Sequence, residues 1–332
     1  MRLPWQSRAS RSSGWWDDPL NRARLPVRIY ASKWTHRLLP ARVALPLAAT
    51  LGPFVRQRRN PAERRDAERF MHDLLLYTPR YGEARELAQS WVTEKARVHE
   101  LFWRPWLLKH SRVLGVEHWH AAHAGGRSAI IVFGHFVGSW TVPAILGLNG
   151  FDHYIVISST HFYQPIPPSY PRLVIEQTRR EYLERPLGES HLISSDAPPE
   201  RALDLVESGS SVAIAFDVNG TSPTPFLGRT VFLTGGPATL AFRTGAKLLP
   251  AIAERRGTRI DLRLLEPIDP TSYRNIRSLR TAVVRIFEPI VLARPEMVEM
   301  VGFPSPLVSE MPLAEVWRAD DEAAVRAPGR AP

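Results

Sequence analysis

Short apolar runs alternate with amphipathic segments along most of the chain. Residues 129–133, 154–158 and 211–216 are continuous apolar runs, which are typical of strands buried on both faces of a sheet. Residues 248–253 and 259–265 predict two more strands. Because the segments between most of these runs have helical patterns, the order of elements favours a mostly parallel sheet covered by helices.

The predicted helices lie before, between and after these strands. They cover residues 61–77, 83–109 with an interruption near Pro105, 140–148, 171–184, 198–207, 237–244 and 274–296. The predicted fold class is therefore α/β, with one domain built on a mostly parallel central sheet and with an N-terminal helical segment before it. The predicted boundaries are an N-terminal arm and apolar segment (1–60), the main domain (61–300) and a C-terminal tail (301–332).

Composition narrows the possible chemistry. The chain has 332 residues, 44% of them hydrophobic and 23% charged, which is the composition of a globular protein. It has no cysteine, so a disulfide scaffold, a cysteine-ligated metal site and a cysteine nucleophile are all excluded. No motif for another metal site is apparent, and we expect neither a metal nor a cofactor.

The positive charge is concentrated at the N-terminus. Residues 1–65 hold 14 lysines and arginines against three acids, whereas the rest of the chain has 29 basic and 30 acidic residues. Such an arm is typical of contact with an anionic lipid surface or a nucleic acid. The arm also carries Trp5, Trp15, Trp16, Tyr30 and Trp34, and aromatic residues of this kind favour a membrane interface.

An uncharged run at residues 43–55 follows the arm. It is shorter than the roughly 20 residues that span a bilayer, and it contains Pro46 and Pro53. We therefore expect an element that lies in the membrane interface, with the basic arm on an anionic membrane surface and no nucleic acid bound. The alternative is a buried first helix with a solvated basic tail.

Two predicted strands end in residues that carry reactive groups. The first is followed by Gly134, His135, Gly138 and Ser139, and the third by Asp217. In parallel sheets ligands bind at the carboxyl ends of strands, so His135 and Asp217 meet there if their strands are neighbours. A histidine oriented by a carboxylate is a general base, and the small residues leave room for a substrate. The alternative is a histidine that only satisfies a backbone carbonyl.

Residues 225–250 form a second notable segment. Thr234 is a predicted N-cap of the helix at 237–244, and Gly245 is its predicted end. The helix start behind Thr234 and Gly235 is a candidate anion site. The alternative is an ordinary turn between a strand and a helix, which would give the same sequence pattern.

Together these segments resemble the lysophospholipid acyltransferase family, of the type that includes the lipid A late acyltransferases and the phosphatidylinositol mannoside acyltransferases. The run Gly134-His135-Phe136-Val137-Gly138-Ser139-Trp140 stands in the place of the family's Gly-His-Phe-Gly-Asn-Trp motif. Asp217-Val218-Asn219 matches an acidic element, and residues 225–250 match the segment that follows it, with one extra glycine.

The resemblance implies an acyltransferase that moves a fatty acyl chain from acyl-CoA or acyl-carrier protein to a hydroxyl of a lipid or glycolipid. It implies His135 as a catalytic residue and a location on the cytoplasmic face of the cell membrane, and the positions of the strand ends add Asp217 as the second catalytic residue. It also implies a substrate-binding set; its members are Gly134, Gly138, Ser139, Trp140, Asn219, Arg180, Arg229, Thr234 and Gly235.

The sequence departs from the family at the acid that normally lies five residues after the histidine. Trp140 occupies that position or, if Val137 is an insertion, Thr141 does. We therefore expect Asp217 to orient His135 in place of the missing acid. The alternative is a non-catalytic member of the same fold that binds acyl chains or lipids.

Overall fold

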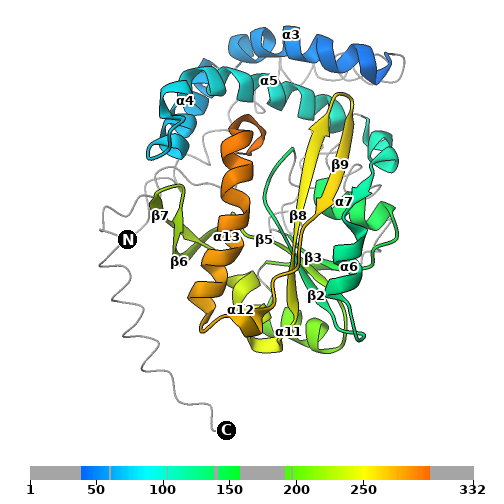
Figure 1. Cartoon of the computed structure of the whole chain (residues 1–332). Helices are drawn as coiled ribbons and strands as arrows, with labels where there is room; N and C mark the ends of the chain where they lie inside the picture. The colour runs from blue at the N-terminus through cyan, green and yellow to red at the C-terminus, as the bar shows by residue number, and fades with distance from the viewer. Residues whose placement is uncertain are drawn as a thin grey trace.

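The computed structural model describes residues 39–59, 61–102, 104–137, 141–157, 191–195 and 197–299. The predicted arm at 1–38, the predicted helix at 171–184 and the tail at 301–332 lie outside these residues. In Figure 1 the central sheet runs through the molecule, with helices α3 and α5 across its top and helices α11 and α12 at its bottom.

The main sheet has seven strands in the order β1-β9-β8-β2-β5-β3-β4. Strands β8, β2, β5, β3 and β4 run parallel, whereas β9 is antiparallel to β8 and carries β1 beside it. The prediction of a mostly parallel sheet is thus confirmed. Its strands are β1 (Val113–Leu114), β2 (Ala129–Phe133), β3 (Tyr154–Ile157), β4 (Leu192–Ser194), β5 (Val212–Ala215), β8 (Lys247–Arg256) and β9 (Arg259–Leu264).

Strand β2 lies in the middle of the sheet, and all five of its residues are buried. Helices cover both faces of the sheet, which explains why the strand is continuously apolar instead of alternating. Strand β8 is longer than predicted, because Glu254–Arg256 continues as an antiparallel hairpin with the first residues of β9. These charged residues gave no strand signal in the sequence.

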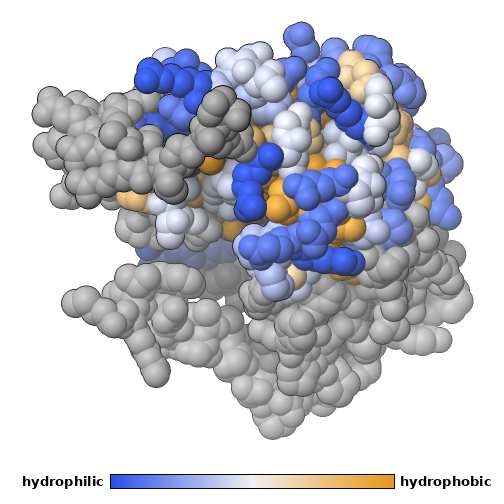
Figure 2. All heavy atoms as spheres, turned by 90° about the horizontal axis from the view of Figure 1, so that it is seen from below, coloured by the Kyte–Doolittle hydropathy of each residue, from blue (hydrophilic) through white to orange (hydrophobic). Residues whose placement is uncertain are grey.

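The helices largely follow the prediction. Helices α6 and α7 lie on one face of the sheet, and α11 and α12 lie on the other (Figure 1). Figure 2 views the molecule from below. It shows hydrophobic side chains near the centre of the visible surface, among hydrophilic ones. The helix bounds are α3 (Ala41–Arg59), α4 (Pro61–Leu75), α5 (Ala84–Phe102), α6 (Val116–Ala122), α7 (Thr141–Leu148), α11 (Pro199–Glu207), α12 (Gly236–Thr244) and α13 (Ile276–Ala293), with short 3-10 helices η2 (Tyr81–Glu83), η3 (Pro105–His110), η6 (Pro270–Ser272) and η7 (Pro295–Met297).

The two ends of α12 differ in how well the sequence predicts them. The helix ends at Gly245, whose φ of 72° is the left-handed conformation expected there. Its N-cap is Gly235 and not Thr234, which corrects the prediction by one residue. Thr234 still serves the helix start, because its Oγ1 accepts a 3.3 Å hydrogen bond from the Gly236 N–H.

A second, two-stranded sheet was missed by the sequence reasoning. It pairs β6 (Asn219–Phe226) with β7 (Arg229–Leu233), joined by a turn at Leu227 and Gly228. Both turn residues have positive φ, 50° and 79°, as the tight primed turns of hairpins require. Strand β6 contains two prolines and no alternating pattern, so its sequence does not look like a strand.

Helix α3 contains the apolar run that was predicted to lie in a membrane interface. Ala44 and Leu45 are buried, and the helix packs on α5. On its other side Val43, Leu47 and Leu51 are about half exposed, at successive turns of one helix face. No helix among the described residues is long and apolar enough to cross a membrane.

Candidate functional site

His135 and Asp217 meet at the carboxyl end of two neighbouring strands. Strands β2 and β5 are parallel, with Phe133 opposite Ala215, so residues two positions further along fall side by side. The His135 Nδ1 lies 2.6 Å from Asp217 Oδ1. The predicted pairing of these two side chains is therefore seen in the structure, and it follows from the register of the two strands.

Asp217 is held from two directions. Its second oxygen, Oδ2, accepts a 2.7 Å hydrogen bond from the backbone N–H of His135. The carboxylate is completely buried, and a buried charge is tolerated only when it is paired and hydrogen-bonded. In the neutral form of His135, donation of the Nδ1–H hydrogen bond to Asp217 leaves Nε2 with a free lone pair on the other side of the ring.

The environment of His135 favours its protonated form. Burial lowers the pKa of the imidazole, but the charge and the hydrogen bond of Asp217, with a smaller contribution from the charge of Glu299, outweigh burial and raise that pKa above its ordinary value of 6.5. A group with this pKa is basic enough to accept a proton near neutral pH.

The loop that carries His135 is held by the segment after α13. Phe136 and Val298 form an antiparallel bridge, and the Glu299 N–H donates a 2.7 Å hydrogen bond to the His135 carbonyl. Trp91 of α5 anchors this segment through a 2.7 Å hydrogen bond from its indole N–H to the Val298 carbonyl. These contacts fix the backbone on both sides of His135.

Val137 ends the described part of this loop. It has a φ of 56°, a left-handed conformation that is uncommon for a β-branched residue. Its N–H donates to the Met297 carbonyl at 3.1 Å, and its own carbonyl accepts a 2.9 Å bond from Thr141 Oγ1. The surrounding hydrogen bonds thus hold a backbone conformation that is strained by itself.

Gly134 has a different role from the predicted one. A Cβ atom at this position would lie 2.4 Å from the ring of Phe136 and 2.9 Å from the ring of Phe216. Both rings stack on Phe287 of α13. The absent side chain therefore leaves room for aromatic packing, and Gly134 is not among the residues that line the cavity beside His135.

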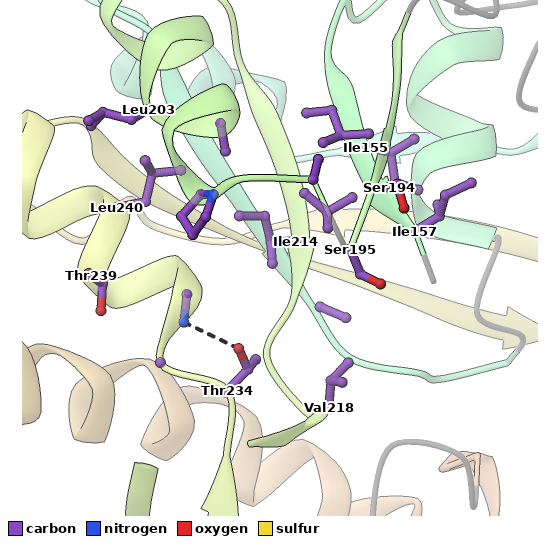
Figure 3. Close-up of a pocket in the computed structure, with 18 of the residues that line it drawn as sticks. Ile155, Ile157, Ser194, Ser195, Leu203, Ile214, Val218, Thr234, Thr239 and Leu240 are labelled. Atoms are coloured by element: carbon purple, nitrogen blue, oxygen red, sulfur yellow. Dashed lines mark hydrogen bonds between the residues drawn. The ribbon is translucent and has the colours of Figure 1, made fainter. Parts of the chain in front are cut away.

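A large cavity opens beside His135, between the sheet and helices α11 and α12. Its volume is about 730 Å³, within the range of small-molecule sites. In Figure 3, Thr234 and Thr239 lie on one side of it, Ser194 and Ser195 on the other, and Ile214 between them. Its apolar wall comprises Phe133, Ile155, Val156, Ile157, Ile193, Ala197, Pro198, Pro199, Ala202, Leu203, Ile214, Ala215, Val218 and Leu240.

The start of α12 forms part of this cavity. Thr234, Gly235 and Gly236 line it, as does Thr239 one turn later. A Cβ atom on Gly235 would come within 2.9 Å of Ser222 Oγ. Two of the predicted substrate-binding residues, Thr234 and Gly235, thus line this cavity, and their role stays a prediction.

Of the other predicted site residues, Arg229 is the one whose side chain the structure describes, and it does not line the cavity. Arg229 lies in β7 beside Asp73 and Tyr77 of the α4 region; burial lowers its pKa while these two neighbours raise it, with a lower pKa as the result. Asn219 begins β6, and the structure describes only its backbone. The remaining predicted residues, Gly138, Ser139, Trp140 and Arg180, lie outside the described residues.

Sequence reasoning missed Ser194, Ser195, Thr239 and Arg243 as cavity residues. Ser194 ends β4 and Ser195 follows it, and this three-residue strand is too short to give a periodic signal. Thr239 lies on a helix that was predicted, but which face of that helix meets the sheet is set by packing. Among the residues that the structure describes, no three metal-ligating side chains form a group.

No protein-family model matches the chain, and no curated protein matches it. Among solved structures it is similar to the 1-acyl-sn-glycerophosphate (LPA) acyltransferase PlsC from Thermotoga maritima, with 18% sequence identity and a TM-score of 0.36. That similarity covers 76% of this chain and 94% of the other. Because identity and TM-score are this low, the function proposed below rests on the geometry of the site.

Proposed function

We propose that this chain is an acyltransferase that moves a fatty acyl group from a thioester donor to a hydroxyl of a lipid or glycolipid. One observation carries the proposal: the His135–Asp217 pair stands at the wall of a large, mostly apolar cavity. The pair provides a base, and the cavity provides room for a hydrocarbon chain beside it. The donor is acyl-CoA or acyl-carrier protein, as the resemblance implies.

The chemistry follows from the tautomer of His135. Its Nε2 takes the proton of the acceptor hydroxyl as that oxygen attacks the thioester carbonyl. The new carbon–oxygen bond forms, the carbon–sulfur bond breaks, and the imidazolium returns its proton to the leaving thiolate. Asp217 keeps the ring in place and stabilises the positive charge that forms on it, as a triad carboxylate does.

Thr141 supports the assignment of the orienting role to Asp217. It is the candidate for the family's acid position if Val137 is an insertion, and its hydroxyl binds the Val137 carbonyl. This threonine holds the loop, whereas Asp217 already contacts both the ring and the backbone N–H of His135. An acid five residues after the histidine is then not needed to orient it.

We propose that the protein works at an anionic membrane surface, on its cytoplasmic face. The exposed face of α3 carries Val43, Leu47, Leu51 and Phe54, each between 46% and 55% exposed. An apolar helix face of this kind suits the boundary between head groups and acyl chains. The basic, tryptophan-rich arm that precedes it would add electrostatic attraction.

The test is multiple-turnover acyl transfer with purified full-length protein in detergent. The assay supplies labelled palmitoyl-CoA or palmitoyl-acyl-carrier protein and a membrane lipid extract, and mass spectrometry identifies the product. We expect wild type to form a labelled lipid and His135→Ala to form none. His120→Ala, an exposed histidine on α6, is the matched control and should act like wild type. Stoichiometric donor binding without turnover would contradict the proposal.

A further inference from the structure

A second cavity is lined by Phe136, the residue that follows His135 in the same loop. It has a volume of about 430 Å³ and lies between the β8–β9 hairpin and the C-terminal end of α13. Its floor is apolar and includes Phe136, Ile252, Ile290 and Met297. We call it the arginine-rimmed cavity, because arginine side chains line its edge.

Four arginines line its edge: Arg255, Arg256, Arg263 and Arg294. Among the described residues that line the cavity, Glu254 is the one acid. Arg256 and Arg263 both pair with this single carboxylate. One positive charge at the edge is therefore left without a counter-charge from this group.

The shortage of carboxylates recurs at Arg255 but not at Arg294. Arg255 makes hydrogen bonds of 2.6 and 2.9 Å to Glu94, but Glu94 also pairs with Arg97. Arg294 pairs with Glu296. Counting all these pairs, five arginines face three carboxylates, so the edge carries a surplus of positive charge.

Arg263 shows unused hydrogen-bonding capacity at this edge. Its Nε is buried and has no hydrogen-bond partner among the described residues. Its side chain is 41% exposed as a whole, and that of Arg256 is 55% exposed, so both guanidinium groups can reorient toward a ligand. A guanidinium presents paired donors that match the oxygens of a phosphate.

We propose that the arginine-rimmed cavity binds a single-chain amphiphile with a phosphate head group. The hydrocarbon chain lies on the apolar floor, and the phosphate meets Arg256 and Arg263. The volume suits one chain and not a two-chain phospholipid, since it lies in the lower part of the range for small-molecule sites. This site is separate from the cavity beside His135 and does not depend on acyl transfer.

The position of the site has a consequence for the loop. Phe136 and Met297 belong to its floor, and the Met297 carbonyl accepts the hydrogen bond from Val137. A bound chain therefore contacts both segments that hold His135 in place.

The test is isothermal titration calorimetry of the full-length protein with octyl phosphate below its critical micelle concentration. We expect octyl phosphate to bind at one site per chain. Inorganic phosphate, which lacks the hydrocarbon chain, and octanol, which lacks the phosphate, should each bind with at least about tenfold lower affinity. The variant Arg256→Gln/Arg263→Gln should weaken octyl phosphate by about tenfold or more. Ile290→Trp, which fills the floor, should also weaken it.

Control variants separate this site from the proposed active site. Arg259→Gln, on the same hairpin but paired with Asp261, should bind octyl phosphate like wild type. His135→Ala should also bind normally, whether or not the chain is an acyltransferase. Leu203→Trp fills the cavity beside His135 and should leave the affinity for octyl phosphate unchanged.

Four results would overturn the proposal. They are unchanged affinity in the double arginine variant, loss of binding in Leu203→Trp, equal affinity for inorganic and octyl phosphate, and binding to phosphatidic acid vesicles without binding to monomeric octyl phosphate. The third result would indicate a simple anion site, and the fourth a membrane-contact surface.

Discussion

The two cavities next to the His135 loop differ in chemistry, although adjacent residues of that loop, His135 and Phe136, line them. His135 faces a cavity of about 730 Å³ whose wall is mainly apolar, whereas Phe136 faces one of about 430 Å³ edged by arginines. The difference shows that one short loop can serve two environments, because its adjacent residues His135 and Phe136 line different cavities. The cavity beside His135 contains one arginine, Arg243, whereas four arginines line the other cavity.

Loss of the Asp217 carboxylate should have the largest effect on the His135 side. We expect Asp217→Asn to lower kcat/KM for acyl transfer by about 10³- to 10⁴-fold, since the ring loses its orienting partner. Steady-state kinetics measure this. Asp204→Asn, an exposed acid on α11, is the control, and an equal loss in both variants would argue against a specific role of Asp217.

Phe287 packs against the rings of Phe136 and Phe216 and should contribute to the free energy of unfolding. Its ring stacks on Phe216 at 4.3 Å and on Phe136 at 6.2 Å, and it is fully buried. We expect Phe287→Ala to lower the free energy of unfolding by about 3–5 kcal/mol. Urea denaturation measures it. Tyr77→Ala, at a site 59% exposed, should change it by less than about 0.5 kcal/mol.

Filling the cavity beside His135 should show whether it holds the acyl chain, independently of the arginine-rimmed cavity. We expect Leu203→Trp to lower kcat/KM for a long-chain donor by about 10- to 100-fold, because the indole takes space meant for the chain. Acetyl-CoA or butyryl-CoA should be affected less. An equal loss with short and long donors would show that the cavity does not hold the chain.

The smallest expected effect is a shift in the pH profile. The pKa of His135 is raised, and the base must be unprotonated, so kcat/KM should fall as the pH drops through a value above 6.5. The charge of Glu299 contributes to this raised pKa, so Glu299→Gln should move the acid limb toward lower pH. A limb that stays in place, or moves upward, would contradict this contribution.

The sequence predicted the parts of the site that depend on local pattern and strand register. Strand β2 has its predicted bounds, and the pairing of His135 with Asp217 needed only that β2 and β5 be neighbours. The β6–β7 hairpin was not predictable, because the prolines of β6 hide its strand character. The surroundings of Gly134 were hidden for a related reason: the rings of Phe136 and of Phe216, which lies on another strand end, occupy the space beside it.

The arginine-rimmed cavity was invisible in the sequence. Arg256, Arg263 and Arg294 belong to separate elements, and only the packing of α13 against the hairpin brings them to one edge. Their surplus charge was also hidden, because the chain after residue 65 is nearly neutral as a whole.

The central claim is that His135 and Asp217 act as one unit in acyl transfer. A double-mutant cycle tests it most directly, with turnover of labelled donor measured for wild type, His135→Ala, Asp217→Asn and the double variant. Residues that act as a unit are strongly non-additive, so the double variant should be no slower than His135→Ala alone. Additive losses, or turnover by His135→Ala at the wild-type rate, would contradict the claim.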